Sequence, residues 1–263
     1  LTQVSRGDAA LDDLDLNPIL VQAERDIEAG SPRDRDREAV PDTLDALMVR
    51  DADTALQFGS KMQLSYNVEN TQRAIGTRLS SHIVRKFGMT GLRENHISVR
   101  LRGTAGQSLG AFATQGLRLE VIGDANDYVG KGLSGGTIIV RPSAAAAFVA
   151  HENTIIGNTV LYGATSGKLF AAGQAGERLC VRNSGATAVV EGAGTNACEY
   201  MTGGRVVILG EVGDNFGAGM TGGMAFVYDP AGRFMDRVNP ESLQVVRIGT
   251  SHWEAELKGL VEV

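Results

Sequence analysis

A repeat of about 18 residues runs through the second half of this chain and constrains its fold more than any other feature. Each copy begins with a Ser-Gly or Thr-Gly pair followed by a short apolar run, and successive marker glycines are 32, 18, 18 and 19 residues apart. A regular period near this length is typical of a solenoid, in which each repeat contacts only its neighbours. The pairs are Ser134-Gly135, Ser166-Gly167, Ser184-Gly185, Thr202-Gly203 and Thr221-Gly222.

Three columns of apolar residues recur at fixed distances from the marker glycines. Members of a column should share one side of the stack, because alternate residues of a strand point to the same face. Gly116, with Leu119 and Val121, predicts one earlier repeat, and the 32-residue gap holds an irregular one that includes residues 143–147. The columns are Ile138, Phe170, Ala188, Val206 and Ala225; Val140, Ala172, Val190, Ile208 and Val227; and Val129, Leu161, Leu179, Ala197 and Phe216.

The repeat predicts a mainly β fold, a right-handed parallel β-helix of about six or seven rungs that spans about 30 Å. Stacking must supply its stability, and glycine should form the corners because it reaches positive φ without steric cost. A left-handed β-helix of hexapeptides remains the alternative, since 18 is three times six. The offsets of nine and eleven residues between columns do not divide into sixes.

The rest of the chain predicts a small α/β lead-in before the β-helix and a helix after it. We expect a lead-in region at 1–95, the glycine-rich repeat at 96–230, and a C-terminal strand and truncated helix at 231–263. Residues 31–38 are predicted to be a linker, and helices are predicted at 43–58 and 70–87, which stop at Gly59 and Gly88. Strands are predicted at 61–68, 96–101 and 245–248. The capping-box pattern Ser251-His-Trp-Glu254 predicts the start of a last helix.

Charge and composition exclude several classes of protein. The net charge of −6 and the pI near 5.3 argue against nucleic-acid and anionic-membrane partners. No apolar stretch is long enough for a transmembrane helix, and no export signal is visible, so we expect a cytoplasmic protein. Because the chain starts at Leu1 and stops at Val263 within or just after a helix, it reads as part of a longer protein. Cys180 and Cys198 should stack on neighbouring rungs as reduced, partly buried thiols.

Two short motifs resemble catalytic or nucleotide-binding signatures. The run Gly130-Lys-Gly132-Leu-Ser-Gly135 matches G-x-G-x-x-G, and its central part also fits G-x-S-x-G around Ser134. Both signatures require a helix after the loop, whereas 137–140 predicts a strand. The first pattern also recurs 87 residues later, as Gly217-Ala-Gly219-Met-Thr-Gly222. We therefore interpret both motifs as architecture.

Ionisable residues provide further candidates. Asp124, Asp127 and Asp214 could bind calcium or act as acids and bases. Of the column members between Asp127 and Asp214, which are Thr159, Glu177 and Thr195, only Glu177 is a carboxylate, so we predict corner-capping Asp residues instead. The histidines His82, His96, His151 and His252 lack metal-ligand spacing. Arg73, Arg78, Arg85 and Lys86 predict a solvated helix face, with docking on an acidic neighbour as the alternative. We predict no catalytic, cofactor-binding or metal residue.

Longer runs carry a family resemblance. The segment from Met62 to Phe87 resembles the sequence that leads into the C-terminal domain of the large subunit of bacterial glutamate synthase. Four further runs are similar to that domain, and together they extend the resemblance over about residues 15–260. They are Leu101–Gly110, Gly123–Gly136, Glu152–Thr165 and Asn215–Met224.

The resemblance implies a structural β-helix domain in a larger enzyme. That enzyme makes L-glutamate from L-glutamine and 2-oxoglutarate with reducing equivalents. Its amidotransferase, central and FMN-binding domains would be partners of this chain, together with a small subunit. FMN, a [3Fe-4S] cluster, FAD, [4Fe-4S] clusters and NADPH would serve the parent complex, with none expected in this chain.

Two other functions remain open at this point. The chain could be a stand-alone subunit of a formylmethanofuran dehydrogenase-type complex that shares the glycine-rich fold. A more distant alternative is a polysaccharide-cleaving β-helix enzyme, which would need a carboxylate–arginine cluster on one face.

Overall fold

The computed structural model describes residues 4–5, 7–13, 15–20 and 41–262, and it divides the chain into two compact units, Leu1–Pro41 and Asp42–Val263. The described residues of the first unit form two short helices, α1 (Ala9–Asp12) and α2 (Asn17–Leu20). The linker predicted at 31–38 lies outside the described residues.

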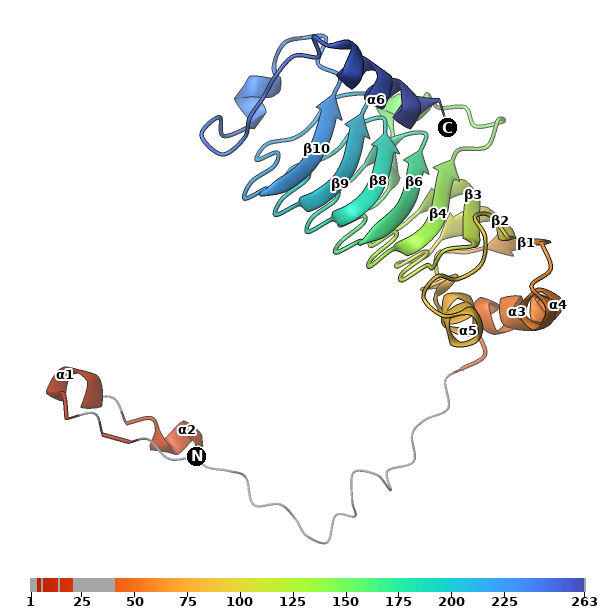
Figure 1. Cartoon of the computed structure of the whole chain (residues 1–263), viewed down its shortest axis with the longest axis horizontal. Coiled ribbons are helices and arrows are strands. Elements are labelled where there is room, and N and C mark those ends of the chain that lie inside the picture. The colour runs from red at the N-terminus through yellow and green to blue at the C-terminus, as the bar shows by residue number, and fades with distance from the viewer. Residues whose placement is uncertain (1–3, 6, 14, 21–40, 263) are drawn as a thin grey trace, which may run out of the picture. The chain divides into compact units, whose positions relative to one another are not determined.

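The second unit is built on an open parallel sheet of ten strands, so the prediction of a mainly β fold is confirmed (Figure 1). Its principal strands follow the order β1-β2-β3-β4-β6-β8-β9-β10. Four of the five Ser/Thr-Gly pairs open a strand, and in the fifth Thr221 precedes β10 while Gly222 is its first residue. The strands are β1 (Met62–Val68), β2 (Ile97–Ala105), β3 (Leu117–Ala125), β4 (Ser134–Arg141), β5 (Thr154–Ile156), β6 (Ser166–Ala171), β7 (Gln174–Ala175), β8 (Ser184–Val190), β9 (Thr202–Ile208) and β10 (Gly222–Val227).

The strand register confirms most of the predicted columns and corrects two of their members. Leu169, not Phe170, pairs with Ile138, and Ala171, not Ala172, pairs with Val140. The register shifts between Ser134 and Thr137, where β4 has one residue more than β6. This bulge at the marker glycines moves each later residue of β6 by one position, so the fixed offset counted from the glycine fails there.

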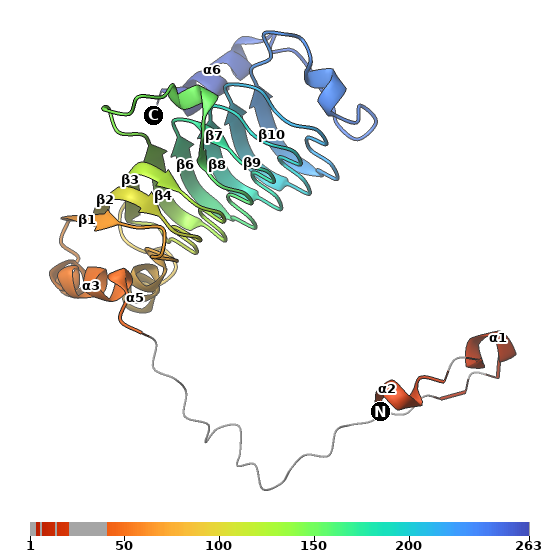
Figure 2. The ribbon, with the colours of Figure 1, turned by 180° about the vertical axis from the view of Figure 1, so that it is seen from behind.

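A second, shorter ladder runs beside the long strands. Ala125 at the end of β3 pairs with Ile156 of β5, and β5 pairs with β7. Isolated bridges continue the ladder from Ala175 to Ala193 and from Ala193 to Val212. After β4, β6, β8 and β9 the chain therefore turns and pairs again with a neighbouring repeat. Figure 2 shows the ribbon of these repeats from behind.

Three helices pack at the β1 end of the sheet. The segment predicted as a helix at 43–58 forms two, α3 (Leu44–Asp51) and α4 (Asp53–Phe58), and Gly59 ends the second in the left-handed conformation. The helix predicted at 70–87 begins only at Thr77, as α5 (Thr77–Phe87). The early start was wrong because the buried carboxylate of Asp45 accepts hydrogen bonds from the backbone N–H groups of Gly76 and Arg78, both at 2.8 Å, and so fixes where α5 begins.

Asp45 is nearly fully buried in this position. Burial raises the pKa of its carboxyl group, and the backbone hydrogen bonds together with the charge of Arg78 oppose that shift. Leu79 and Ile83 of α5 join a continuous apolar core that extends along the stack to Phe216.

The C-terminal segment departs from prediction at its strand. Residues 245–248 form no strand, although their apolar run suggested one. The last helix, α6 (Ser251–Val261), is confirmed, but its N-cap is Thr250 and Ser251 lies inside it, so the capping box was misplaced. An ion pair of 3.3 Å between Glu256 of α6 and Arg205 joins the helix to β9. Two short 3₁₀ helices, η1 (Ala150–Glu152) and η2 (Phe234–Arg237), complete the fold.

None of the helices described is long and apolar enough to cross a membrane.

Candidate functional site

The Gly-x-Gly motif belongs to a turn that precedes the strands and recurs along the stack. In each copy three alternate residues have positive φ. Glycine occupies two of the three positions in some copies and none in others, so the expectation that glycine forms every corner was wrong. The triplets are Ser108, Gly110 and Phe112; Tyr128, Gly130 and Gly132; Thr159, Leu161 and Gly163; Arg178, Cys180 and Arg182; Asn196, Cys198 and Tyr200; and Asn215, Gly217 and Gly219.

Hydrogen bonds to both neighbouring repeats explain the alternation. In the turn 128–132, the N–H groups of Tyr128 and Gly132 donate to carbonyls of the following turn, each at 2.8 Å. The N–H group of Gly130 between them donates to Leu109 of the preceding turn at 2.8 Å. The turns 159–163, 178–182 and 196–200 repeat this pattern. The turns are therefore a third ladder, and their backbone donors are used within the stack.

Glycine is required where a neighbouring side chain occupies the space of a Cβ atom. A Cβ atom on Gly132 would lie 2.5 Å from the ring of Phe112, and one on Gly219 would lie 2.5 Å from the ring of Tyr200. A strand, not a helix, follows both G-x-G-x-x-G runs, which confirms their interpretation as architecture. Ser134 is likewise structural, because its hydroxyl donates to the carbonyl of Gly132 at 2.8 Å as β4 begins.

The acidic candidates take different roles. Asp127 caps a corner as predicted, because its carboxylate accepts a hydrogen bond from the backbone N–H of Asn158 at 2.8 Å. Asn158 in turn accepts one from the backbone N–H of Glu177 at 2.8 Å. Asp214 instead forms an ion pair with Arg237, and Asp124 is exposed at the end of β3. In the part of the chain that the structure describes, no three His, Cys, Asp or Glu residues are placed to hold a metal ion.

The two cysteines are free thiols and fully buried in adjacent turns, more deeply than predicted. Burial raises the pKa of Cys198 to about 12, and burial followed by the proximity of Cys198 raises the pKa of Cys180. Neither thiol is ionised near neutral pH. They are core residues of the turns.

The four histidines lie in separate parts of the fold, and the basic residues near α5 differ in exposure. His82 lies in α5, His96 bonds the carbonyl of Gly59, His151 lies in η1 and His252 contacts Trp253. The basic residues on and before α5 include the exposed Arg73, Arg85 and Lys86, whereas Arg78 is half-buried.

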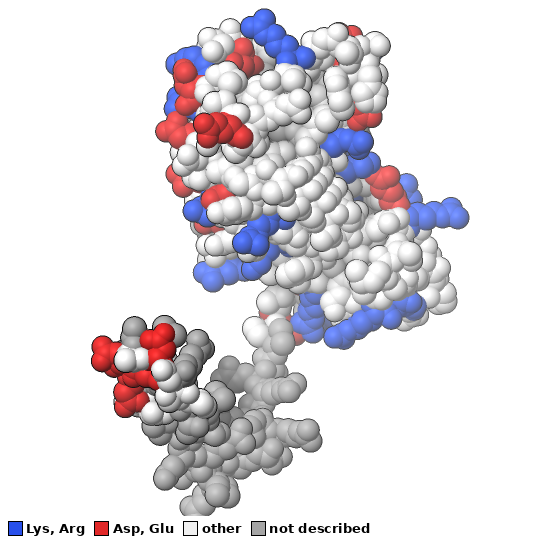
Figure 3. All heavy atoms as spheres, turned by 60° about the vertical axis from the view of Figure 1, so that its left-hand side comes forward, with Lys and Arg blue, Asp and Glu red and all other residues white. Residues whose placement is uncertain are grey.

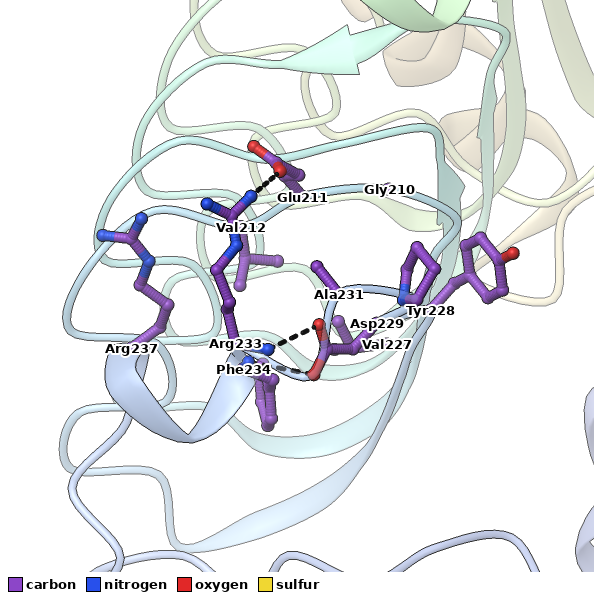
Figure 4. A pocket seen from close by; sticks show the side chains of 11 residues that line it. Gly210, Glu211, Val212, Val227, Tyr228, Asp229, Ala231, Arg233, Phe234 and Arg237 are labelled. Atoms are coloured by element: carbon purple, nitrogen blue, oxygen red, sulfur yellow. Dashed lines mark hydrogen bonds and ion pairs between the residues drawn. The ribbon is translucent and has the colours of Figure 1, made fainter.

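A pocket lies beside the end of β10, and its charged side chains are already paired (Figure 4). The carboxylate of Asp229 accepts hydrogen bonds from the backbone N–H groups of Arg233 and Phe234, at 3.0 and 2.9 Å. These bonds, led by that of Phe234, lower the pKa of Asp229. Arg233 pairs with Glu211 at 2.5 Å. The pocket is thus the interior of a loop that Asp229 holds closed.

Sequence reasoning missed a charge cluster on the solvent side of the sheet. Glu120 of β3 contacts Arg141 at 2.9 Å, Arg100 at 3.4 Å and Arg118 at 3.9 Å. Burial of Glu120 opposes its ionisation, but the hydrogen bond from Arg141 and the charges of Arg100 and Arg141 together leave its pKa below the ordinary value. The register could have shown the cluster, since Arg100 pairs directly with Glu120. Figure 3 shows charged side chains along the margins of a broad band that lacks Lys, Arg, Asp and Glu.

The parallel sheet and the repeated Gly-x-Gly turns define a class of glycine-rich stacked β domains, and the chain belongs to the GXGXG motif family, whose model matches residues 45–263. Relatives with high identity to the chain are glutamate synthases. The chain is 65% identical, over 262 residues and its whole length, to the glutamate synthase (NADPH) large chain of Azospirillum brasilense, of which it covers 17%.

Two more distant relatives give the same result. Identity is 49% over 217 residues with ferredoxin-dependent glutamate synthase 2 of Synechocystis sp., which covers 82% of this chain and 14% of the relative. It is 47% over 215 residues with the glutamate synthase (NADPH) large chain of Bacillus subtilis, which covers 81% and 14%. The predicted resemblance is confirmed, and the chain spans less than a fifth of the length of these relatives.

Proposed function

We propose that this chain is the C-terminal domain of a glutamate synthase large chain and that its role there is structural, not catalytic. The observation that carries the proposal is the alignment of the whole chain, at 65% identity, with only 17% of a much longer glutamate synthase chain. A segment that is one part of a large enzyme need not contain the reactive groups of that enzyme.

The proposed fold in detail is a right-handed parallel β-helix. Three ladders support it: the long strands, the short strands with their bridges, and the hydrogen-bonded turns. Each repeat contributes one segment to each ladder, which is how a solenoid rung contacts its neighbours. The helices α3 to α5 would then cover the first rung, and the loop around Phe234 would cover the last, where this ring packs edge-on against Phe216 at 5.2 Å.

The side chains that suggested chemistry support a structural role. Asp127 is used in capping a turn, Ser134 bonds the turn that precedes its own strand, and Asp229 closes a loop. Cys180 and Cys198 lie in the core with raised pKa values, which disfavours a nucleophilic thiolate.

In this proposal the chemistry belongs to the rest of the enzyme. The parent would make L-glutamate from L-glutamine and 2-oxoglutarate in the cytoplasm. Its amidotransferase, central and FMN-binding domains, and a small subunit, would be the partners of this domain. FMN, FAD, the iron–sulfur clusters and NADPH would be bound by those partners, and this chain would brace them.

Replacement in a relative tests the proposal. The Azospirillum large chain with its matching segment exchanged for this sequence should remain active. D124N and D214N in that protein should leave kcat unchanged, because neither carboxylate would act on substrate. A loss of about 100-fold or more in kcat at unchanged Tm would identify an acid–base residue and contradict the structural role.

A further inference from the structure

A row of aromatic and cationic side chains, all exposed except the half-buried Lys131, follows the turns along one edge of the stack. Five consecutive turns each contribute one member of this corner stripe, which consists of Phe112, Lys131, Tyr162, Arg182 and Tyr200. Backbone hydrogen bonds place successive turns side by side: the N–H group of Phe112 donates to Lys131 at 2.8 Å, and that of Arg182 donates to Glu199 at 3.0 Å. Figure 1 shows these turns as a row of loops at the tails of the strand arrows.

The aromatic members of the corner stripe are exposed. Phe112 is 56% exposed, Tyr200 52% and Tyr162 37%. With neighbouring turns about 4.8 Å apart, the five side chains extend over roughly 20 Å. Large apolar side chains exposed together, and not singly, indicate an interaction surface.

Local packing fixes the orientation of two of these rings, Phe112 and Tyr200. Phe112 lies against Gly132 of the next turn and Tyr200 against Gly219, in the space that a Cβ atom would occupy. The guanidinium of Arg182 stands over the ring of Tyr200, 5.6 Å from its centre. Rings held in this way lose little conformational entropy when a partner binds.

The composition of the corner stripe fits a protein partner. Tyrosine and arginine dominate the residues that contribute most to binding energy in protein interfaces, and aromatic residues are enriched there. A net charge of −6 disfavours nucleic acid, which would otherwise also suit aromatic and cationic groups.

We propose that the corner stripe docks onto the remainder of the glutamate synthase large chain, at a face that presents apolar and carboxylate side chains. This inference rests on the proposed function. The relative that matches this chain at 65% identity is about six times longer, so most of that polypeptide lies outside this segment. Covalent attachment holds such a partner at high local concentration, which favours docking of even a modest surface. Carboxylates on that face would pair with Lys131 and Arg182.

Hydroxyl-radical footprinting tests the inference directly. This chain would be oxidised free in solution and as the replacement segment within the full-length Azospirillum large chain. Phe112, Tyr162 and Tyr200 should lose most of their reactivity in the full-length protein. Phe58 and Tyr228, which are 76% and 62% exposed and lie outside the corner stripe, serve as internal controls and should stay reactive.

The outcomes separate the two proposals. If the footprint of the full-length protein equals that of the free chain everywhere, no docking occurs and the proposed structural role fails together with the corner stripe. If other surfaces are protected while the three rings stay reactive, the corner stripe is wrong and the structural role stands.

A pair of variants gives independent support. F112A/Y200A should lower the Tm of the full-length protein while leaving that of the free chain nearly unchanged, because both rings are half exposed in the free chain. F58A/Y228A is the matched control and should lower neither. Equal Tm values for both double variants in the full-length protein would overturn the inference.

Discussion

Two turns of the same stack have positive φ at the same three positions but place different residues there. The turn 128–132 has glycine at two of its three left-handed positions, whereas the turn 178–182 has arginine, cysteine and arginine. The φ angles nevertheless agree, at 65° for Gly130 and 60° for Cys180. A non-glycine residue costs about 1–2 kcal/mol at such an angle. The hydrogen bonds to both neighbouring turns must therefore impose the conformation, and glycine is needed only where another side chain occupies the Cβ position.

The largest expected effect comes from removing a buried side chain that replaces glycine. Leu161 occupies the position of Gly130 in the next turn and is fully buried. L161A should destabilise the chain by about 2–5 kcal/mol, because it leaves a cavity in the core of the turn. Urea denaturation measures this loss. L161M is the control and should cost less than about 1.5 kcal/mol. A loss below that value for L161A would show that the turn contributes little to the core.

A smaller loss of stability is expected from substitution at the third positive-φ position of a turn, which is Gly132 in one turn and Arg182 in another. G132A should destabilise by about 1–2 kcal/mol from backbone strain alone, with a further cost as the ring of Phe112 moves. R182G makes the opposite change at the equivalent position. Its free energy of unfolding should stay within about 1 kcal/mol of that of the unsubstituted chain, because relief of strain offsets the greater entropy of glycine in the unfolded chain. Thermal unfolding of both variants compares them. Equal losses would refute the view that neighbouring side chains decide where glycine is needed.

The repeat could be predicted from the sequence because its columns recur in the printed residues. All members of the Val129 column are buried as expected, and so are Ile138, Ala188 and Val206 of a second column, whereas Ala225 is only partly buried. Phe170 and Ala172 were assigned to the wrong columns because the bulge in β4 was not predicted. Its only sequence signal is the second glycine, Gly136, after the marker Gly135. The prediction that glycine forms the corners failed at residues such as Cys180. Hydrogen bonds to the neighbouring repeats impose the positive φ of Cys180, and local sequence does not reveal those bonds.

Other errors have the same origin. The start of α5 depends on Asp45, which lies 31 residues before Gly76, so helix periodicity could not reveal it. Asp127 was correctly assigned to capping because aspartate favours turns, whereas the pairing of Asp214 with Arg237 needed the fold.

A modest effect is expected at the charge cluster outside the turns. Because the folded pKa of Glu120 lies below the ordinary 4.5, its stabilisation is present above pH 4.5 and is lost as pH falls through the folded pKa. E120Q should therefore cost up to about 1 kcal/mol at neutral pH, and its deficit should vanish in acid and shrink in high salt. Stability measured across pH checks this. E94Q, at an exposed pair with Lys168, should have no such profile. A deficit independent of pH would contradict the charge-based account.

The smallest signal is expected from the thiols. Cys180 and Cys198 are fully buried and have raised pKa values, so neither should react with a thiol reagent at pH 8 in the folded chain. Both should react in denaturant. Rapid reaction of the folded chain would show that these turns open readily.

The visible absorption spectrum of the purified 263-residue chain tests the central claim most directly. A structural domain whose cofactors belong to its partners should be colourless, with only protein absorbance in the ultraviolet. Stoichiometric flavin or iron–sulfur bands would contradict the account and would make the acidic residues and the two cysteines candidates for a genuine site.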